Sequence, residues 1–167
     1  SNGALFSSGR KLDGTQFSGC VQEPTTPIEI WAIQGTGLAT VFANLNVTTA
    51  DNVVTAVTPT GFFMQTPEAR TDGIAETSDG IFVFTESAPS VAVGDMVDVS
   101  GLLVEFFDLT EYSANPIVTI KSTGNALPTP FTFDANTRSP IQPQPENELE
   151  RFEGMLVQIS NGIATGP

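Results

Sequence analysis

A strand pattern with a glycine inside it runs through residues 94–103, which read GDMVDVSGLL. The first two residues favour a turn, and strict alternation of apolar and polar side chains follows. Alternation of this kind places one set of apolar side chains on the inner face of a sheet, here Val97, Val99 and Leu103. Gly101 interrupts the strand where a side chain would normally help packing, which indicates a sharp bend or bulge. Such a bend lets one strand serve both halves of a barrel, and after it we expect the inward phase to change to Leu102, Val104 and Phe106.

Other short β-rich runs surround this strand and are separated by Gly, Pro, Asn and Asp, a spacing typical of an all-β sandwich or barrel. The runs are 28–33, 53–57, 62–65, 81–85, 116–121 and 155–159. A very tight turn separates 53–57 from 62–65, so these two form a predicted hairpin. We expect a closed or nearly closed five-stranded antiparallel barrel over about 50–122, with Val57 and Val83 also buried. The runs 28–33 and 155–159 are predicted flanking N- and C-terminal strands.

The chain divides into four predicted segments. Residues 1–27 read as a tag remnant and linker, because they begin with SNG and end in a proline-rich break. Residues 28–133 form the barrel domain, and 134–148 are a linker with three prolines. Residues 149–167 hold a C-terminal strand, which either flanks the barrel or starts a following domain.

Composition excludes several functions. The 167 residues include 19 acidic and 6 basic side chains and no histidine, so the formal net charge is -13. Without histidine, Ser-His-Asp and Cys-His nucleophilic systems and most catalytic zinc sites are excluded. The single Cys20 cannot form an internal disulfide. The sequence has no run of about 18 apolar residues, so it predicts no membrane-spanning helix.

The short β runs, together with the Gly-Asp turn and the glycine inside the strand at 94–101, resemble an OB-fold barrel. More specific segments occur in order: IWAIQG (30–35), VVTAV (53–57), GFFMQTP (61–67), SDGIFVF (78–84), VGDMV (93–97), GLLVEFFDLT (101–110) and LERFEGMLV (149–157). This series resembles the OB-like region of large secreted bacterial nucleases, where it precedes an endonuclease/exonuclease/phosphatase catalytic domain. The resemblance covers roughly 30–160.

The resemblance implies an extracellular or cell-surface bacterial protein in which this module is accessory. The catalytic domain of that family holds a divalent metal with histidines and acidic residues, and this chain has no histidine. We therefore expect no catalysis by this chain, and a catalytic nuclease domain of the same protein as its partner. The connection from Glu86 to Val93 is short, whereas many OB-folds carry a helix there. The barrel is therefore expected to be uncapped, or capped by flanking segments.

OB-folds stack single-stranded bases on aromatic side chains, and several aromatic residues are candidates for such a platform. They are Phe62, Phe63, Phe106, Phe107 and Tyr112. In each Phe-Phe pair, strand alternation sends one ring inward and the other outward, which leaves an outward ring for stacking. The alternative is that all the rings belong to the core or lie under loops. Only Arg70 and Lys121 lie within the barrel segment to contact phosphates, so we expect any binding of single-stranded nucleic acid to be weak.

Two groups of carboxylates are further candidates. The loop 68–79 contains Asp72, Glu76 and Asp79, whose oxygen ligands suit Ca²⁺ or Mg²⁺, although the spacing is not that of an EF-hand and the loop can simply be solvated. A second group, Glu105, Asp108 and Glu111, lies beside Phe106 and Phe107. It can supply acid–base chemistry or charges that protect a strand edge.

The leading hypothesis is a non-catalytic OB-fold accessory module of a secreted nuclease, which helps engage or orient nucleic acid or positions the catalytic domain. The first alternative is a structural or protein-interaction β-barrel without nucleic-acid affinity, which the negative charge favours. The second alternative is a calcium- or carbohydrate-binding surface module.

Overall fold

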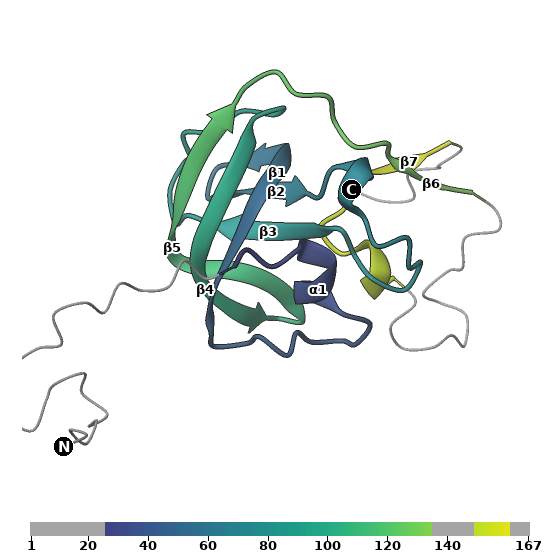
Figure 1. The fold of residues 1–167 in the computed structure, drawn as a ribbon, viewed down its shortest axis with the longest axis horizontal. Coiled ribbons are helices and arrows are strands. Elements are labelled where there is room, and N and C mark those ends of the chain that lie inside the picture. The colour runs from purple at the N-terminus through teal and green to yellow at the C-terminus, as the bar shows by residue number, and fades with distance from the viewer. Residues whose placement is uncertain (1–25, 135–148, 161–167) are drawn as a thin grey trace, which may run out of the picture.

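The computed structural model describes residues 26–134 and 149–160 (Figure 1). Cys20 and nearly all of the predicted linkers 1–27 and 134–148 lie outside the described residues. The elements are α1 (Ile30–Gln34), β1 (Asn46–Thr58), β2 (Gly61–Gln65), a 3-10 turn (Glu68–Arg70), β3 (Gly80–Phe84), β4 (Met96–Phe106), β5 (Leu109–Ser122), β6 (Phe131–Phe133), a second 3-10 turn (Glu150–Phe152) and β7 (Val157–Ile159).

Five strands close into a barrel in the order β1-β2-β3-β5-β4, with β4 paired back to β1. This confirms the predicted OB-fold-like barrel. The sheet is not wholly antiparallel, because β3 and β5 run in the same direction and pair Phe82 with Glu111 and Val83 with Tyr112. The physical reason is that strand directions cannot alternate around a closed ring with an odd number of members, so at least one neighbouring pair must be parallel.

The predicted irregularity at Gly101 is confirmed. In the pairing of β4 with β5, the register shifts between Ser100 and Leu102, while Gly101 pairs with Val47 of β1 on the other side. A Cβ on Gly101 would lie 2.8 Å from the Cβ of Pro116, so the close approach of β5 excludes a side chain there. β4 is bonded to β1 along one edge and to β5 along the other, and Gly101 lies where these three strands approach closely.

The barrel core contains four of the five valine and leucine side chains predicted to be buried. Each of these is fully buried: Val83, Val97, Val99 and Leu103. The prediction for Val57 is wrong, because it is 42% exposed where β1 ends at the β1–β2 hairpin. The predicted phase change after Gly101 is also wrong: Leu103 is inward and Phe106 is exposed. Ser100 and Leu102 of β4 pair with Ile117 and Ser113 of β5, so the extra residues of the irregularity lie in β5. The inward and outward alternation of side chains along β4 therefore continues past Gly101.

The N-terminal segment forms a helix, which corrects the prediction of a strand at 28–33. Ile30 and Ile33 lie three residues apart on one side of α1, and both are fully buried in the barrel core. Gly35 ends the helix with φ 66°, and its N–H donates to the carbonyl of Trp31 at 2.9 Å. α1 therefore caps the lower end of the barrel in Figure 1, which confirms capping by a flanking segment.

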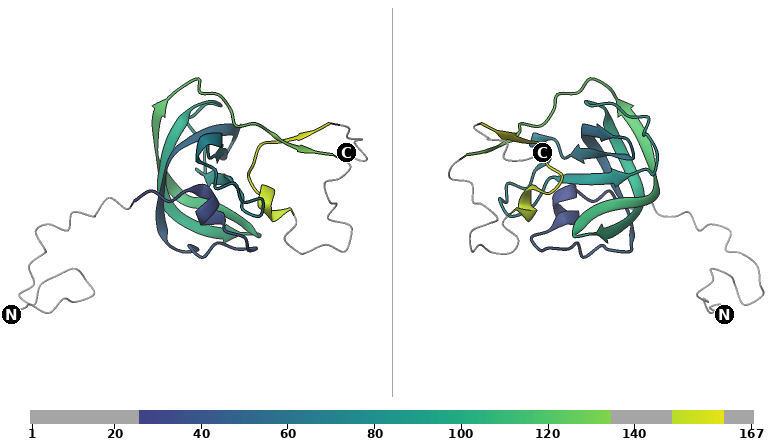
Figure 2. Two further views of the ribbon diagram at one scale, coloured as in Figure 1. Left: turned by 45° about the vertical axis from the view of Figure 1, so that its right-hand side comes forward. Right: turned by 180° about the vertical axis from the view of Figure 1, so that it is seen from behind.

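The C-terminal described segment contacts the barrel domain. β7 pairs in parallel with β6, and the two form a ribbon beside the barrel (Figure 2). The ring of Phe152 lies 4.3 Å from that of Phe131 and 5.1 Å from that of Phe133, measured between centroids. These contacts hold residues 149–160 against β6, so the predicted C-terminal strand is present as β7.

Candidate functional site

The outer face of β2 and β3 carries an aromatic pair. Residues that pair directly across strands share a face of the sheet, and the register here is continuous from Ala56 to Phe63, to Phe82 and to Glu111. The rings of Phe63 and Phe82 are half-buried, with centroids 4.8 Å apart and planes at 46°. OB-folds bind ligands with this face and with the loops between strands 1 and 2 and between strands 4 and 5. These surfaces together form the candidate site.

The structure divides the predicted aromatic residues between core and surface. Phe62 and Tyr112 are fully buried inside the barrel, so neither offers a face on which a base could stack. Phe63 lies on the outer face, as alternation within the Phe62–Phe63 pair requires. Sequence reasoning missed Phe82, although the inward position of Val83 is a signal that its neighbour points outward.

The β4–β5 turn presents the most exposed aromatic side chains among the described residues. Phe106 is 56% exposed and Phe107 is 90% exposed, and their rings meet edge to face with centroids 4.7 Å apart. Phe106 pairs with Leu109, so the loop has two residues, and these have φ values of 51° at Phe107 and 63° at Asp108. Positive φ at both positions is the geometry of a tight hairpin turn that usually takes Asn and Gly. A phenylalanine there is strained and still leaves its ring in solvent.

Residues 153–157 cover one end of the β2–β3 face. The hydroxyl of Ser78 donates to the carbonyl of Glu153 at 2.6 Å, and the N–H of Leu156 donates to Oε1 of Gln65 at 2.8 Å. Gly80 permits this contact, since a Cβ there would lie 2.3 Å from the carbonyl carbon of Gly154. The OB-like ligand face is thus partly occupied by the chain itself.

A groove of about 320 Å³ remains between this segment and the barrel. Thr55, Ala56 and Phe63 line its barrel side, and residues 154–157 line the other. Its lining is mostly apolar. The groove therefore suits an apolar side chain or a ring rather than a charged group.

Carboxylates crowd beside the β4–β5 turn. Oε1 of Glu153 accepts hydrogen bonds from Nε2 of Gln34 and from the N–H of Thr110, both at 3.0 Å. Burial, with the charges of Glu150 and Glu105 adding to it, raises the pKa of Glu153 to about 7. Burial also raises the pKa of Glu150, and the nearby charges of Glu105 and Asp108 raise it further. This end of the barrel therefore holds several carboxyl groups close together, two of which bind their protons more tightly than they would in water.

The structure separates the predicted group Glu105, Asp108 and Glu111. Glu105 and Asp108 act on Glu150, as its raised pKa shows. Oε1 of Glu105 accepts from the N–H of Thr40 at 2.7 Å and from the hydroxyl of Thr110 at 2.8 Å. Glu111 instead pairs with Phe82 on the outer face, where burial raises its pKa. These contacts assign Glu105 a role in holding the loop around Thr40.

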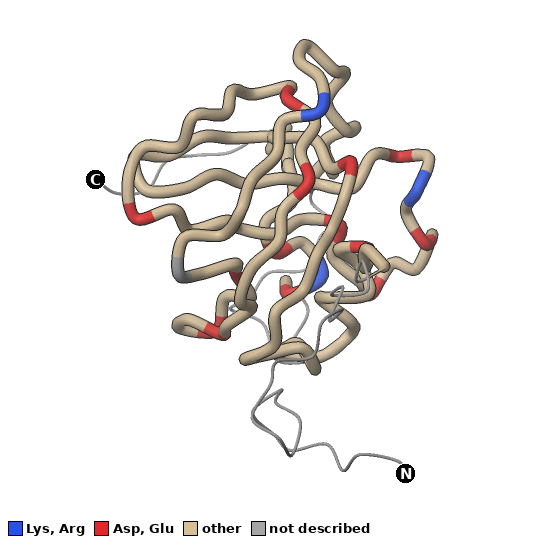
Figure 3. Tube along the Cα trace, turned by 60° about the vertical axis from the view of Figure 1, so that its left-hand side comes forward, with Lys and Arg blue, Asp and Glu red and all other residues tan. Residues whose placement is uncertain are grey.

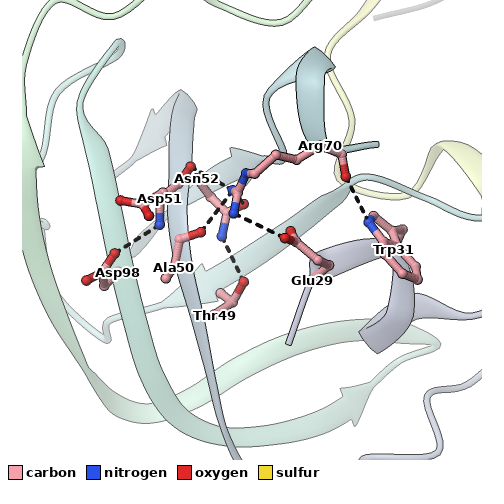
Figure 4. A network of polar contacts seen from close by, with 8 residues as sticks. All are labelled: Glu29, Trp31, Thr49, Ala50, Asp51, Asn52, Arg70 and Asp98. Carbon is pink, nitrogen blue, oxygen red and sulfur yellow. Dashed lines mark hydrogen bonds and ion pairs between the residues drawn. The ribbon is translucent and has the colours of Figure 1, made fainter. Parts of the chain in front are cut away.

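Arg70 is engaged in a polar network beside β1, where the register of β1 against β4 shifts between Thr49 and Asn52 (Figure 4). Its Nη1 forms an ion pair with Glu29 at 3.2 Å. Its Nη2 donates to the carbonyls of Ala50 at 2.9 Å and Asp51 at 2.8 Å, and to Oδ1 of Asn52 at 3.1 Å. The guanidinium thus ties the 3-10 turn to β1 and leaves little capacity for a phosphate.

The other described cations also have partners. Lys121 forms an ion pair with Asp98 at 3.1 Å, and the bond raises the pKa of Lys121. The guanidinium of Arg151 lies 4.5 Å from the ring centroid of Phe152. Figure 3 shows acidic positions spread over the barrel with few basic ones among them. Arg70 and Lys121 do not converge on the aromatic surface, because their partners hold them at Glu29 and Asp98.

The acidic loop uses one of its three predicted metal ligands internally. Oδ1 of Asp72 accepts from the N–H of Ile74 at 2.9 Å and from the hydroxyl of Thr77 at 3.0 Å, and Glu76 is exposed. Burial, then the charges of Asp72, Glu68 and Glu29, raise the pKa of Asp79 to about 6. Within 26–134 and 149–160, no three or more His, Cys, Asp or Glu side chains are grouped so that they could hold a metal ion. Asp72, Glu76 and Asp79 therefore do not converge on one centre.

No protein-family model, curated protein or solved structure matches the chain in comparisons with known proteins. In the part of the chain that the structure describes, no helix is long and apolar enough to cross a membrane. Function is therefore inferred from the barrel and its outer surface.

Proposed function

We propose that this chain is a non-catalytic OB-like module that docks protein and positions a neighbouring domain. On the resemblance to secreted bacterial nucleases, that domain is the catalytic domain of such a nuclease. The observation that carries the proposal is Phe107, which is 90% exposed and held at positive φ beside the exposed ring of Phe106.

The conformation of the turn supports an intermolecular or interdomain role for these rings. A bulky side chain in the left-handed region costs on the order of 1–2 kcal/mol. Among the described residues, the ring contact that offsets this cost for Phe107 is the edge-to-face contact with Phe106. Exposed aromatic side chains at the tip of a rigid hairpin are well suited to fill a pocket on a partner, where aromatic anchors contribute most of the binding energy.

The charge distribution favours protein over a polyanion as the partner. Proteins that bind a nucleic-acid backbone neutralise phosphates with Lys and Arg. Here Arg70 and Lys121 are held in ion pairs with Glu29 and Asp98. Carboxylates lie next to the exposed rings, and they repel phosphates at contact.

The test uses the natural full-length gene product and its Phe107→Ser variant. If the turn docks on a neighbouring domain, the variant should show a larger radius of gyration in small-angle X-ray scattering and faster proteolysis between domains. The matched control is Ile117→Ser, which changes a side chain that is 72% exposed elsewhere on the barrel. Equal scattering and equal proteolysis of the wild type and Phe107→Ser would refute docking through this turn.

A second candidate function is weak binding of single-stranded nucleic acid, which the Phe63–Phe82 pair on the OB ligand face favours. Stacking contributes roughly 1–3 kcal/mol per base, so one or two rings give only weak affinity. Ca²⁺ or Mg²⁺ would have to bridge phosphates to carboxylates such as Asp79, because Arg70 and Lys121 are already paired with Glu29 and Asp98.

Fluorescence anisotropy with a labelled single strand at low salt tests this candidate, with Ca²⁺, with Mg²⁺ and with chelator. Binding that requires the metal and is lost in Phe63→Ala would support it. Millimolar or weaker binding under every condition would leave protein docking as the function. Binding that survives both chelator and the Phe63 substitution would place the surface elsewhere.

A further inference from the structure

We propose that the partner of the β4–β5 turn is a basic protein segment, in which Lys or Arg side chains flank an apolar residue that packs on Phe107. This inference deepens the proposed docking function and rests on it. It follows from three observations: an exposed apolar centre, carboxylates near it, and the engagement of Arg70 and Lys121 in ion pairs elsewhere.

The apolar centre extends beyond the two phenylalanines. The loop before β1 runs beside β4, where the N–H of Asn44 donates to the carbonyl of Leu103 at 2.7 Å and the N–H of Leu103 donates to the carbonyl of Leu45 at 3.0 Å. This loop exposes Val41 by 86% and Leu45 by 52%. The N–H of Thr40 in the same loop donates to Oε1 of Glu105, the residue before Phe106, so the loop and the turn expose apolar side chains at the same edge of the barrel.

Carboxylates from two separate parts of the chain lie near this surface, and among them Asp108 is exposed. Asp108 belongs to the turn, and Glu150 comes from the C-terminal segment. Glu105 lies at the end of β4, with its Oε2 buried and its Oε1 bonded to Thr40 and Thr110. Burial raises the pKa of Glu150, and the charges of Glu105 and Asp108 raise it further, so each of these two groups lies close enough to repel Glu150. Glu153 adds a fourth carboxylate, whose Oε1 is bonded to the N–H of Thr110.

A cationic partner relieves this repulsion, whereas an acidic or polyanionic partner increases it. Arg70 and Lys121 are engaged in ion pairs elsewhere, and Arg151, next to Glu150 in the chain, lies over the ring of Phe152. Lys and Arg also gain from contact with the faces of aromatic rings, so the exposed phenylalanines and the carboxylates favour the same side chains. Charge complementarity of this kind accelerates association and selects among partners.

The experiment uses the whole chain and three fluorescein-labelled peptides of equal length, GKFKLKG, GSFSLSG and GEFELEG, in fluorescence anisotropy at low salt. We expect the lysine peptide to bind at least tenfold more tightly than the serine peptide and the glutamate peptide to bind least. Raising the salt to 0.3 M should weaken the lysine peptide several-fold, because screening shortens the reach of charges.

Two variants locate the contact. Phe107→Ser and Asp108→Asn should each weaken the lysine peptide at least fivefold, and asparagine suits the positive φ at position 108. Ile117→Ser is the control for loss of an exposed apolar side chain and should bind as the wild type. Thermal unfolding of each variant checks that the barrel is intact.

The outcomes separate the two proposals. If the serine or glutamate peptide binds as tightly as the lysine peptide and still depends on Phe107, the basic partner is refuted and the docking surface stands. If the lysine peptide binds Phe107→Ser as it binds the wild type, the docking surface itself is refuted. Absence of lysine-peptide binding up to millimolar concentration would also overturn the inference.

Discussion

Replacing Glu153 by glutamine is expected to stabilise the protein above neutral pH and to leave its stability unchanged in mild acid. The carboxyl group is half-buried, and its Oε1 accepts hydrogen bonds from Gln34 and Thr110. A glutamine Oε1 can accept the same two bonds, and its amide hydrogens can donate to the neighbouring carboxylates. The substitution therefore removes the charge and keeps the contacts.

The magnitude follows from the raised pKa. Burial, with nearby Glu150 and Glu105, raises the pKa of Glu153 from 4.5 to about 7. The folded state therefore binds the proton of Glu153 more tightly than the unfolded state does, so protonation of Glu153 stabilises the folded protein. This contribution is fully present below about pH 4.5 and is lost as pH rises through about 7. A change of one in pKa corresponds to about 1.4 kcal/mol of free energy, so the largest gain in unfolding free energy expected from Glu153→Gln is about 3 kcal/mol. Because the group is partly exposed, solvent screening reduces the expected effect to about 1–2 kcal/mol.

The assay is urea unfolding of the wild type and Glu153→Gln at intervals from pH 4.5 to 8.5. The variant should match the wild type at pH 4.5 and be more stable by about 1–2 kcal/mol at pH 8 and above. Asp79 titrates in both proteins, so its contribution cancels in the difference. Glu76→Gln, at an exposed position, is the control and should follow the wild type throughout. A difference for Glu153→Gln that does not change with pH would refute the reasoning.

Three further substitutions test the packing. Gly80→Ala places a Cβ 2.3 Å from the carbonyl carbon of Gly154, so urea unfolding should show a loss of about 1–3 kcal/mol in unfolding free energy. Gly37→Ala is the control and should change this free energy little, because its Cβ would lie 3.7 Å from the carbonyl oxygen of Ala39. Tyr112→Phe removes a buried hydroxyl that has no hydrogen-bond partner among the described residues, so stability should be unchanged or higher; a loss above about 1 kcal/mol would contradict this. Arg70→Lys keeps the charge but loses the planar fork that reaches several acceptors, and thermal unfolding should show a loss of about 1–3 kcal/mol. Wild-type stability in that variant would mean that the network does not hold the 3-10 turn.

The sequence by itself located the five strands of the barrel and the exceptional position of Gly101, although it placed only the later part of β1 (53–57) and of β5 (116–121). Both depend on local properties, because alternation and β-rich composition are read over a few residues, and a glycine inside a strand usually marks a bulge or a close approach of another segment. The absence of histidine and the net charge of -13 also limit the chemistry without any knowledge of the fold.

Only the tertiary structure decided which of two compatible patterns each ambiguous segment follows. Ile28 and Ile30 fit a strand, but Ile30 and Ile33 fit a helix, and burial of the second pair in the barrel end selects the helix. The Phe62–Phe63 pair likewise has one inward ring in either register, and pairing with β3 determines which.

The candidate site depends even more on contacts between distant residues. Glu153 meets Gln34 and Thr110 across 119 and 43 positions of the chain. Burial raises the pKa of Glu153, and these two hydrogen bonds offset part of the increase. Alternation within a strand identifies a face, but neither burial by a distant segment nor repulsion among distant carboxylates appears in a local pattern. The crowding of charge around Phe107 therefore exists only once the barrel has closed and the C-terminal segment lies against it.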